Sequence, residues 1–225
     1  MEIAHEELIK SGFKRTNLPI SFPLIVHGVP GCGKTRFIKN LLSNPLFNAQ
    51  TYGSVVPFNL AGRGIARAPS PLLSGFNILD EYLSGPTVEG FDILLSDPYQ
   101  NFQQPRSAHY TNSVTHRFGP SICQLLQSLG FEISSARSED TEVEIRNIFH
   151  SRLIGEVIAF EPQAIDLLNR HSAKFSHPCE IRGAEFDEVT FVSASRDLQS
   201  IVGADLYISL TRAKKKCLIL KPGGK

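Results

Sequence analysis

Eight consecutive residues near the start of the chain have the types and spacing of a loop that binds phosphate. They fit the pattern G-x-x-x-x-G-K-[ST] at every fixed position. Glycines let backbone N–H groups turn toward phosphate oxygens, the lysine ammonium can reach the β- and γ-phosphates, and the threonine hydroxyl can ligate Mg²⁺. The run predicts a site for ATP and Mg²⁺, with a chance glycine-rich turn as the alternative. Its members are Gly28, Val29, Pro30, Gly31, Cys32, Gly33, Lys34 and Thr35.

Two acidic residues later in the chain could complete this chemistry. Asp80 and Glu81 directly follow the apolar run 76–79. A carboxylate at the end of a strand can hold Mg²⁺, so Asp80 and Thr35 are the predicted metal ligands. Glu81 would then orient and activate the attacking water. The alternative for both acids is a solvated turn.

Gln100 is the next candidate for the site. It follows the apolar run 91–96 and lies three residues after Asp97. A glutamine at the end of a neighbouring strand can sense the γ-phosphate and help to position water. The sequence Asp-Pro-x-Gln is by itself more often a turn, so the prediction depends on the phosphate loop upstream.

Two arginines in the second half are candidates for catalysis. Arg117 and Arg212 each lie beside the edge of a predicted element. An arginine can neutralise the charge that develops on a transferred phosphoryl group. A surface charge or a structural ion pair is the alternative for each of them.

Basic residues that could contact a nucleic-acid backbone form two groups. Lys214, Lys215 and Lys216 are consecutive, whereas Arg63 and Arg67 flank a glycine-rich segment. Contacts to phosphates would give affinity that depends on salt and little on sequence. For the lysines, a solvated helix end is an equally good interpretation.

The elements that must position these residues follow from hydrophobic spacing. A strand over 22–27 and a helix over 36–43 enclose the phosphate loop, which is the setting that the motif requires. Short apolar runs predict strands, and spacings of three and four predict helices. Segment 137–147 is dense in charge and is expected to be an exposed loop or an edge strand. The other expected strands are 52–58, 76–79, 91–96, 157–160, 189–193 and 217–220, and the other expected helices are 2–13, 121–129, 162–171 and 204–211.

Strands and helices therefore alternate twice, which predicts an α/β fold with two parallel-sheet domains. The junction is expected between residues 110 and 117. The predicted organisation is an N-terminal extension over 1–20, a first domain over 21–112 and a second over 113–225.

Composition excludes several other classes of protein. The net charge is +1 and the apolar fraction is 41%, as in an ordinary globular chain. The four cysteines form no C-x-x-C pair, so no zinc site is predicted. The acidic first residues do not resemble a signal peptide, and no apolar run has the length of a membrane-spanning helix.

The order of these motifs resembles one known family. Six short motifs occur in the order of superfamily 1 RNA helicase motifs. They are Gly-Val-Pro-Gly-Cys-Gly-Lys-Thr, Asp-Glu-Tyr, Asp-Pro-Tyr-Gln, Ser-Val-Thr-His-Arg-Phe, Arg-Gly-Ala-Glu-Phe and Ser-Leu-Thr-Arg-Ala-Lys. The chain resembles the triple gene block protein 1 movement proteins of potexviruses, carlaviruses and related plant RNA viruses. The resemblance lies in its short length and in the motifs Ile-Leu-Asp-Glu-Tyr and Ser-Asp-Pro-Tyr-Gln. The similarity runs from about Leu24 to Leu220.

The resemblance implies two small RecA-like domains with ATP between them and no large accessory insertions. Gly28 to Thr35 would bind the phosphates, and Arg117 and Arg212 would be the arginines from the second half. Gly183 and Glu185 would couple the nucleotide and RNA sites. Arg182 stands where the family usually has a glutamine, which departs from the pattern at this coupling step.

The resemblance also implies a biological role. Such proteins bind single-stranded viral RNA, carry it from cell to cell through plasmodesmata and suppress host RNA silencing. The implied partners are further copies of the chain, the viral coat protein, two small membrane movement proteins and host silencing factors. The implied location is the host cytoplasm, with recruitment to plasmodesmata and no insertion into the membrane.

Three functions remain open from the sequence. The first is an ATP-dependent RNA-binding motor. The second is a nucleotide-switched binding protein with weak catalysis that acts mainly in silencing suppression. The third is a small P-loop kinase, which needs an acceptor pocket and lid that segments 84–89 and 137–147 do not clearly supply. The late arginines favour the helicase-like function.

Overall fold

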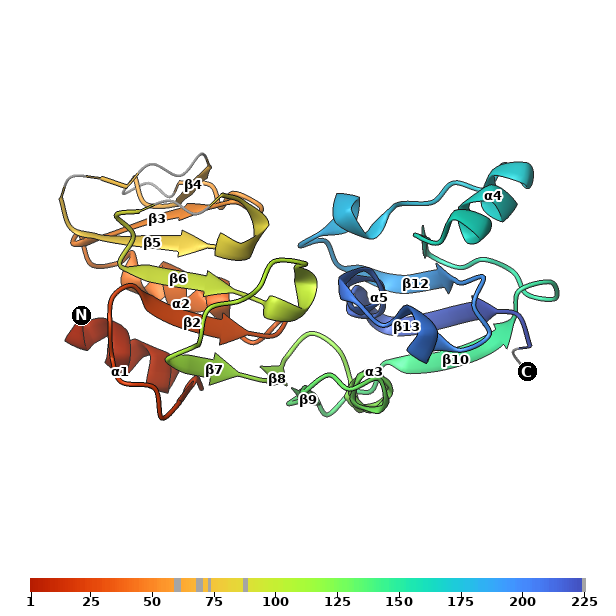
Figure 1. Ribbon diagram of the computed structural model, residues 1–225, viewed down its shortest axis with the longest axis horizontal. Coiled ribbons are helices and arrows are strands. Elements are labelled where there is room, and N and C mark those ends of the chain that lie inside the picture. The colour runs from red at the N-terminus through yellow and green to blue at the C-terminus, as the bar shows by residue number, and fades with distance from the viewer. Residues whose placement is uncertain (59–61, 68–70, 73, 87–88, 224–225) are drawn as a thin grey trace. The chain divides into compact units, whose positions relative to one another are not determined.

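The computed structural model describes residues 1–58, 62–67, 71–72, 74–86 and 89–223 (Figure 1). The chain divides into two compact units, Met1–Val114 and Thr115–Lys225. Residues 1–20, expected to precede the first domain, belong to unit 1. Each unit has its own sheet and its own helices, and each is described here by itself.

Unit 1 contains a seven-stranded sheet with the order β1-β7-β2-β6-β5-β3-β4. The strands β2, β6, β5 and β3 are neighbours in parallel, so crossover connections join them. β2 and β6 are buried along their whole length, which explains their uninterrupted apolar sequences. The strands are β1 (Lys14–Arg15), β2 (Leu24–Gly28), β3 (Phe47–Thr51), β4 (Ile65–Arg67), β5 (Phe76–Asp80), β6 (Ile93–Ser96) and β7 (Tyr110–Asn112).

Two α-helices and two short 3-10 helices complete the described part of unit 1. In α2 (Lys34–Leu41), Phe37, Ile38 and Leu41 are buried at the spacing of one helical face. The amphipathic helix α1 (Glu2–Lys10) contacts α2. The 3-10 helices η1 (Tyr82–Ser84) and η2 (Pro98–Gln100) directly follow the ends of β5 and β6.

The strand expected over 52–58 is wrong. The strand in this region is β3, five residues earlier, where Phe47, Ala49 and Thr51 are buried and β3 pairs with β5. Beyond Thr51 the chain contains Gly53 and Pro57, which disfavour a continuous strand. Within 52–58 the described pairing is an isolated antiparallel bridge between Val56 and Ile65.

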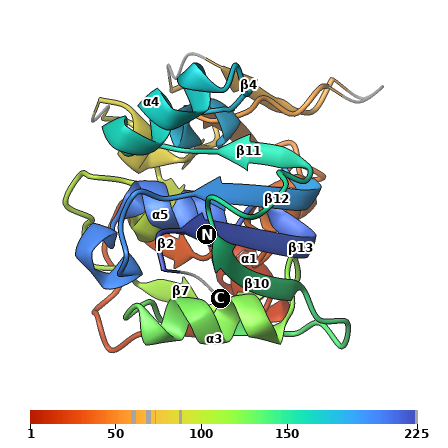
Figure 2. The same ribbon diagram turned by 90° about the vertical axis from the view of Figure 1, so that its right-hand side faces the viewer.

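Unit 2 contains a four-stranded parallel sheet with the order β10-β13-β12-β11. The charged segment over 137–147 contributes the edge strand β10. α3 lies beside β10, whereas α4 lies beside β11 (Figures 1 and 2). The elements of this unit are α3 (Pro120–Ser128), β10 (Glu142–Asn147), β11 (Glu156–Ile158), α4 (Pro162–Arg170), η3 (Pro178–Ile181), β12 (Phe186–Val192), η4 (Leu198–Ile201), α5 (Ala204–Leu210) and β13 (Ala213–Lys221).

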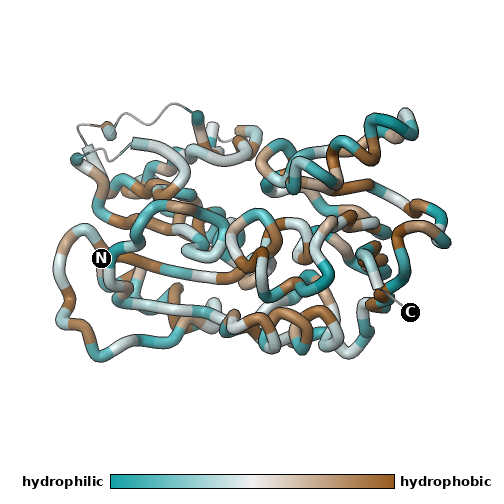
Figure 3. Tube along the Cα trace, turned by 45° about the vertical axis from the view of Figure 1, so that its right-hand side comes forward, coloured by the Kyte–Doolittle hydropathy of each residue, from teal (hydrophilic) through white to brown (hydrophobic). Residues whose placement is uncertain are grey.

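Part of the core of unit 2 forms where α4 packs on the sheet. Ala164 and Leu168 of α4 cluster with Val192, Leu218 and Leu220 of β12 and β13. The short strands β8 (Val114–Thr115) and β9 (Ser134–Ser135) pair where the chain enters this unit. Hydrophobic and hydrophilic stretches alternate along the trace (Figure 3). In the described ranges, no helix combines the length and hydropathy needed to cross a bilayer.

Candidate nucleotide-binding site

The phosphate loop connects the end of β2 to the start of α2. Gly31 and Gly33 have φ values of 75° and 103°, a region that favours glycine. A side chain at Gly28 would lie 2.4 Å from the Cys32 sulfur, so only glycine fits there without movement. The loop thus has the geometry that turns backbone N–H groups toward an anion.

Lys34 lies at the base of this loop and is 8% exposed. Its ammonium donates hydrogen bonds to the carbonyl oxygens of Gly28 at 2.7 Å and Val29 at 3.4 Å. Burial lowers the pKa of Lys34, but the neighbouring ionisable groups, among them Glu81 and Asp97, outweigh it, so the net pKa is raised. The side chain is therefore a fixed positive charge at neutral pH.

Asp80 ends β5 beside the loop. Burial, and then the nearby Glu81, raise the pKa of Asp80 to about 7, while Lys34 opposes the shift. Its Oδ1 is buried and has no hydrogen-bond partner among the described residues. A buried carboxylate oxygen without a partner is a donor that suits Mg²⁺.

Glu81 follows at once with an unusual backbone. Its φ is 54°, in the left-handed region that residues other than glycine rarely adopt. Its Oε2 accepts a hydrogen bond from Ser96 Oγ at 3.5 Å. The absence of a side chain at Gly53 leaves room for Glu81, because a Cβ there would lie 3.1 Å from Glu81 Cγ. Strain of this kind is found often at functional sites.

Gln100 and Asp97 occupy the end of β6. Gln100 Nε2 donates to Asp97 Oδ2 at 2.8 Å, and the Tyr99 N–H donates to Asp97 Oδ1 at 3.0 Å. Burial raises the pKa of Asp97 to about 6, against the effects of Lys34 and Gln100. Since β2, β5 and β6 are parallel neighbours, their carboxyl ends bring the phosphate loop, Asp80 and Asp97 to one edge of the sheet.

Sequence reasoning missed a polar pair beside the loop. His27 Nε2 and the Tyr82 hydroxyl lie 3.0 Å apart, and the Arg106 N–H donates to the same hydroxyl at 3.2 Å. Burial, and then Lys34, lower the pKa of His27 to about 4. The pair connects the residue before the phosphate loop to the residue after Glu81. A histidine directly before the motif was a visible signal, but nothing in the sequence indicated its partner.

The two candidate arginines have different surroundings in unit 2. Arg117 Nε lies 2.8 Å from Glu185 Oε1 as an ion pair, although the N–H does not point at the oxygen as in a hydrogen bond. Arg212 is fully buried and donates to the carbonyls of Ile208 and Ala184 and to the Thr211 hydroxyl. Its guanidinium is therefore held inside its own unit.

The lysine cluster lies on the strand β13 and not at a helix end, so that alternative is wrong. Lys214 and Lys215 pair with Asp187 at 3.1 and 2.6 Å. Lys216 pairs with Glu142 and Glu144 at 3.1 and 2.9 Å. Each lysine charge thus has a nearby carboxylate. Of the other two candidates, Arg67 ends β4 and is exposed, and Arg63 is half-buried.

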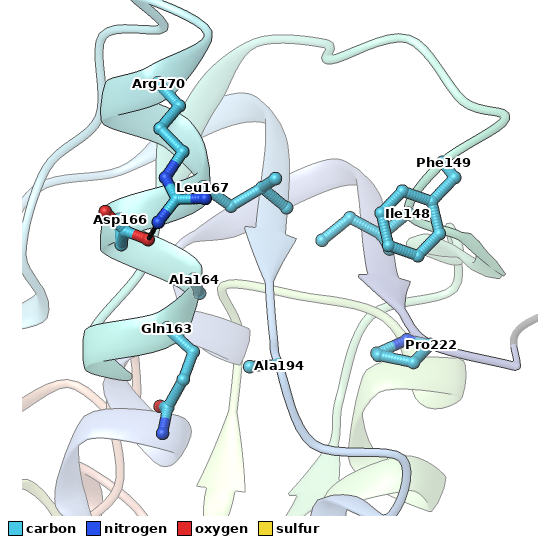
Figure 4. Close-up of a pocket in the computed structure, with 9 residues that line it drawn as sticks. All are labelled: Ile148, Phe149, Gln163, Ala164, Asp166, Leu167, Arg170, Ala194 and Pro222. Carbon is cyan, nitrogen blue, oxygen red and sulfur yellow. Dashed lines mark ion pairs between the residues drawn. The ribbon is translucent and has the colours of Figure 1, made fainter.

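A separate pocket of about 270 Å³ lies in unit 2 (Figure 4). Its wall is mainly apolar, with the ion pair between Asp166 and Arg170, 2.7 Å long, on α4. None of the residues predicted from the sequence to act in the site lines it. The lining residues are Ile148, Phe149, Gln163, Ala164, Asp166, Leu167, Arg170, Ala194 and Pro222.

Solved structures with a similar fold are viral helicases. The arterivirus nonstructural protein 10 helicase in complex with DNA aligns with a TM-score of 0.58 at 20% identity, over 88% of this chain and 60% of that one. The PRRSV helicase aligns with a TM-score of 0.55 at 15% identity, over 97% and 50%. The chain thus spans only about half to 60% of these proteins, and the likeness confirms the predicted RecA-like α/β fold.

Sequence comparison identifies the family. Residues 24–221 match the viral superfamily 1 RNA helicase core domain. The movement and silencing protein TGBp1 of apple stem pitting virus (isolate PA66) is 41% identical over 98% of this chain and 99% of its own length. TGBp1 of papaya mosaic potexvirus is 39% identical over 96% and 93%, and that of potato virus X (strain CP) is 36% identical over 95% and 96%. The chain therefore belongs to the TGBp1 family of viral movement and silencing proteins, with a superfamily 1 RNA helicase core.

Proposed function

We propose that the protein is a Mg²⁺-dependent ATPase that binds single-stranded viral RNA. In this role it would support movement between cells through plasmodesmata and suppress host RNA silencing. One observation carries the proposal: the carboxyl ends of three parallel strands gather the phosphate loop, Asp80, Glu81 and the pair Asp97–Gln100 at one edge of unit 1. Ligands of open α/β sheets bind at such edges.

The roles of these residues follow from their chemistry. Backbone N–H groups within residues 31–35 and the Lys34 ammonium bind the triphosphate. The Thr35 hydroxyl and Asp80 would hold Mg²⁺, which when bound supplies charge neutralisation on the phosphate oxygens. Glu81 orients the attacking water and accepts its proton. Gln100, held by Asp97, contacts the γ-phosphate and reports its presence.

Residues of unit 2 are proposed to act in the same reaction. Arg117 is the stronger candidate for stabilising charge in the transition state, because its surroundings in unit 2 are one ion pair with an exposed carboxylate. Arg212 is included as a second arginine. RNA would be bound through backbone phosphates by Arg63, Arg67 and the cluster Lys214, Lys215 and Lys216.

The proposal extends to partners and location. The chain would form homo-oligomers and act with the viral coat protein, the two small membrane movement proteins and host silencing factors. It would work in the host cytoplasm and be recruited to plasmodesmata. These expectations rest on membership of the TGBp1 family.

ATP hydrolysis by purified protein tests the proposal directly. Hydrolysis by wild type and Lys34→Ala is measured with and without single-stranded RNA at two salt concentrations. The control is Lys39→Ala, because Lys39 is exposed on the last turn of the same helix. We expect turnover that RNA stimulates, that salt weakens and that is lost in Lys34→Ala alone. Absence of ATP binding by the wild type would overturn the proposal.

A second candidate is a nucleotide-switched binding protein with little turnover. The burial of Arg212 inside unit 2 favours it, because three hydrogen bonds must break before this guanidinium can reach a phosphate. Tight, Lys34-dependent ATP binding without RNA-stimulated hydrolysis would support this candidate over the motor.

A further inference from the structure

Asn112, the last residue of β7, makes hydrogen bonds in three directions. Its Nδ2 donates to the Cys32 carbonyl at 3.2 Å and to the Ser11 carbonyl at 3.5 Å. Its Oδ1 accepts from the Val114 N–H at 2.9 Å, and its backbone carbonyl accepts from the Val29 N–H at 3.0 Å. The residue is 7% exposed, so these contacts lie in the interior. A buried polar group that loses its hydrogen-bond partner there destabilises the fold.

Two of these bonds hold the phosphate loop at two points, Val29 and Cys32. The Cys32 carbonyl and the Gly33 N–H belong to one planar trans peptide, in which they point in opposite directions. Holding the carbonyl on β7 therefore aims the Gly33 N–H away from β7. The Val29 N–H is held in the same way, and the Gly28 carbonyl of its peptide accepts from Lys34.

The same side chain reaches the segment that leaves unit 1. Val114 is the last residue of unit 1, and Thr115 begins unit 2. Val114 N–H binds the oxygen of the Asn112 carboxamide, while the nitrogen of that carboxamide binds the loop. Because the carboxamide is planar and rigid, a rotation that follows the Cys32 carbonyl must also move the acceptor of Val114.

We propose that Asn112 is a positioning residue that holds the phosphate loop in its binding conformation and transmits a change of the loop to the connector between the units. The inference rests on the proposed function, since it assumes that the loop binds ATP. It adds a residue outside the helicase motifs and a path by which nucleotide state reaches the connector.

A purely structural role for Asn112 is the competing explanation, and Asn77 is a matched control for it. Asn77 is 4% exposed, lies on β5 of the same sheet, and its side chain donates to the carbonyl and accepts from the N–H of Leu72, both at 3.0 Å. It lies near the amino end of its strand, away from the phosphate loop. Asn77→Ala thus removes comparable hydrogen bonds without touching that loop.

The test compares Asn112→Ala, Asn112→Leu and Asn77→Ala with the wild type. Leucine has the same branching at Cγ as asparagine and makes no hydrogen bonds, so it avoids the cavity that alanine leaves, although it is larger. ATP affinity, melting temperature, and amide hydrogen exchange with and without nucleotide are measured. We expect both Asn112 variants to raise the ATP dissociation constant by roughly threefold to tenfold, the effect of one lost hydrogen bond. Asn77→Ala should lower the melting temperature alone.

Hydrogen exchange separates positioning from stability. In the wild type, nucleotide should slow exchange at Gly33 and change it at Val114; in the Asn112 variants, Val114 should exchange rapidly with or without nucleotide. Unchanged ATP affinity in both Asn112 variants, or Val114 exchange that still responds to nucleotide, would overturn the inference while leaving the ATPase intact. If the wild type shows no Lys34-dependent ATP binding, the proposed function fails and the inference fails with it.

Discussion

Gln100 Nε2 donates a hydrogen bond of 2.8 Å to Asp97 Oδ2 at the end of β6. Asp97 is fully buried and also accepts from the Tyr99 N–H. The carboxylate therefore fixes the direction of the Gln100 side chain, and the second Nε2 proton is the one that could donate to a phosphate oxygen. Fixed orientation is what a residue needs if it is to report the presence of one phosphate group.

Replacement of Gln100 should reduce turnover more than binding. In Gln100→Ala we expect kcat for ATP to fall about tenfold, as for the loss of one positioned polar contact, with a much smaller change in the ATP dissociation constant. Single-turnover hydrolysis and equilibrium binding check this. Gln104→Ala, an exposed glutamine four residues further along, serves as the control. Loss of binding equal to the loss of turnover would contradict a sensing role.

Gly53→Ala tests the space that Glu81 occupies. The new Cβ would lie 3.1 Å from Glu81 Cγ, so the carboxylate must move by a few tenths of an ångström. We expect kcat to fall by roughly tenfold, because misplaced catalytic groups lose rate steeply, with ATP affinity maintained. Gly203→Ala is the control, since nothing lies within 4 Å of a Cβ there. Equal activity of both variants would show that Glu81 tolerates displacement.

Arg212→Ala should destabilise the fold whether or not nucleotide is present. It removes three hydrogen bonds from a fully buried cation and leaves a cavity. We expect a loss of roughly 2–4 kcal/mol in the free energy of unfolding, measured by urea denaturation. The exposed Arg170→Ala should change it by about 0.5 kcal/mol or less. A fully stable Arg212→Ala protein without ATPase activity would instead indicate a directly catalytic arginine.

Asp187→Asn should strengthen RNA binding. Asp187 pairs with Lys214 and Lys215, so its neutralisation frees two cations on β13 for phosphates. The salt dependence of binding should steepen by about one counterion for each lysine that engages a phosphate, and Lys215→Ala should have the opposite effect. Titrations with single-stranded RNA at several salt concentrations check this, with Asp166→Asn, which frees Arg170 on α4, as the control. If Asp187→Asn and Asp166→Asn behave alike, the lysine cluster is not an RNA contact.

His27 should make stability depend on pH. Its pKa is about 4 in the folded protein and 6.5 in the reference state, so the unfolded chain binds the proton more readily. The contribution of His27 to the free energy of unfolding is therefore complete above pH 6.5 and is lost as the pH falls to 4. The total change is on the order of 3 kcal/mol. Buried Asp80 and Asp97 have raised pKa values and act in the opposite direction.

The difference between wild type and His27→Gln isolates this effect. Urea denaturation between pH 7.5 and about 4.5 should show the stability advantage of wild type shrinking as pH falls. Exposed His116→Gln is the control variant. A pH-independent difference for His27→Gln would mean that its bond to Tyr82 survives protonation.

The sequence predicted the elements that bury continuous apolar runs. The strand–loop–helix around Gly28 to Thr35 and the fold class are confirmed, because hydrophobic periodicity and the fixed pattern of the loop are local signals. β3 was misplaced because residues 52–58 contain strand-forming types, whereas pairing with β5 selected the preceding five residues.

The surroundings of single side chains could not be predicted, because they depend on residues distant in the chain. Arg212 binds the carbonyl of Ala184, 28 residues away, and Asn112 binds that of Cys32, 80 residues away. Lys216 meets the carboxylates of β10 only because β10 and β13 pair in register. The assigned roles of the site residues stay predictions until the measurements above are made.

The left-handed backbone of Glu81 sets up a conflict between two kinds of selection. A side chain at φ 54° raises the energy of the fold by about 1–2 kcal/mol relative to glycine. A library of variants screened for heat resistance alone should therefore enrich glycine or asparagine at this position. Each variant selected in this way would lack the carboxylate. If Glu81 has the proposed role, thermostabilised forms of this protein would be recovered without turnover unless the screen also selects for ATP hydrolysis.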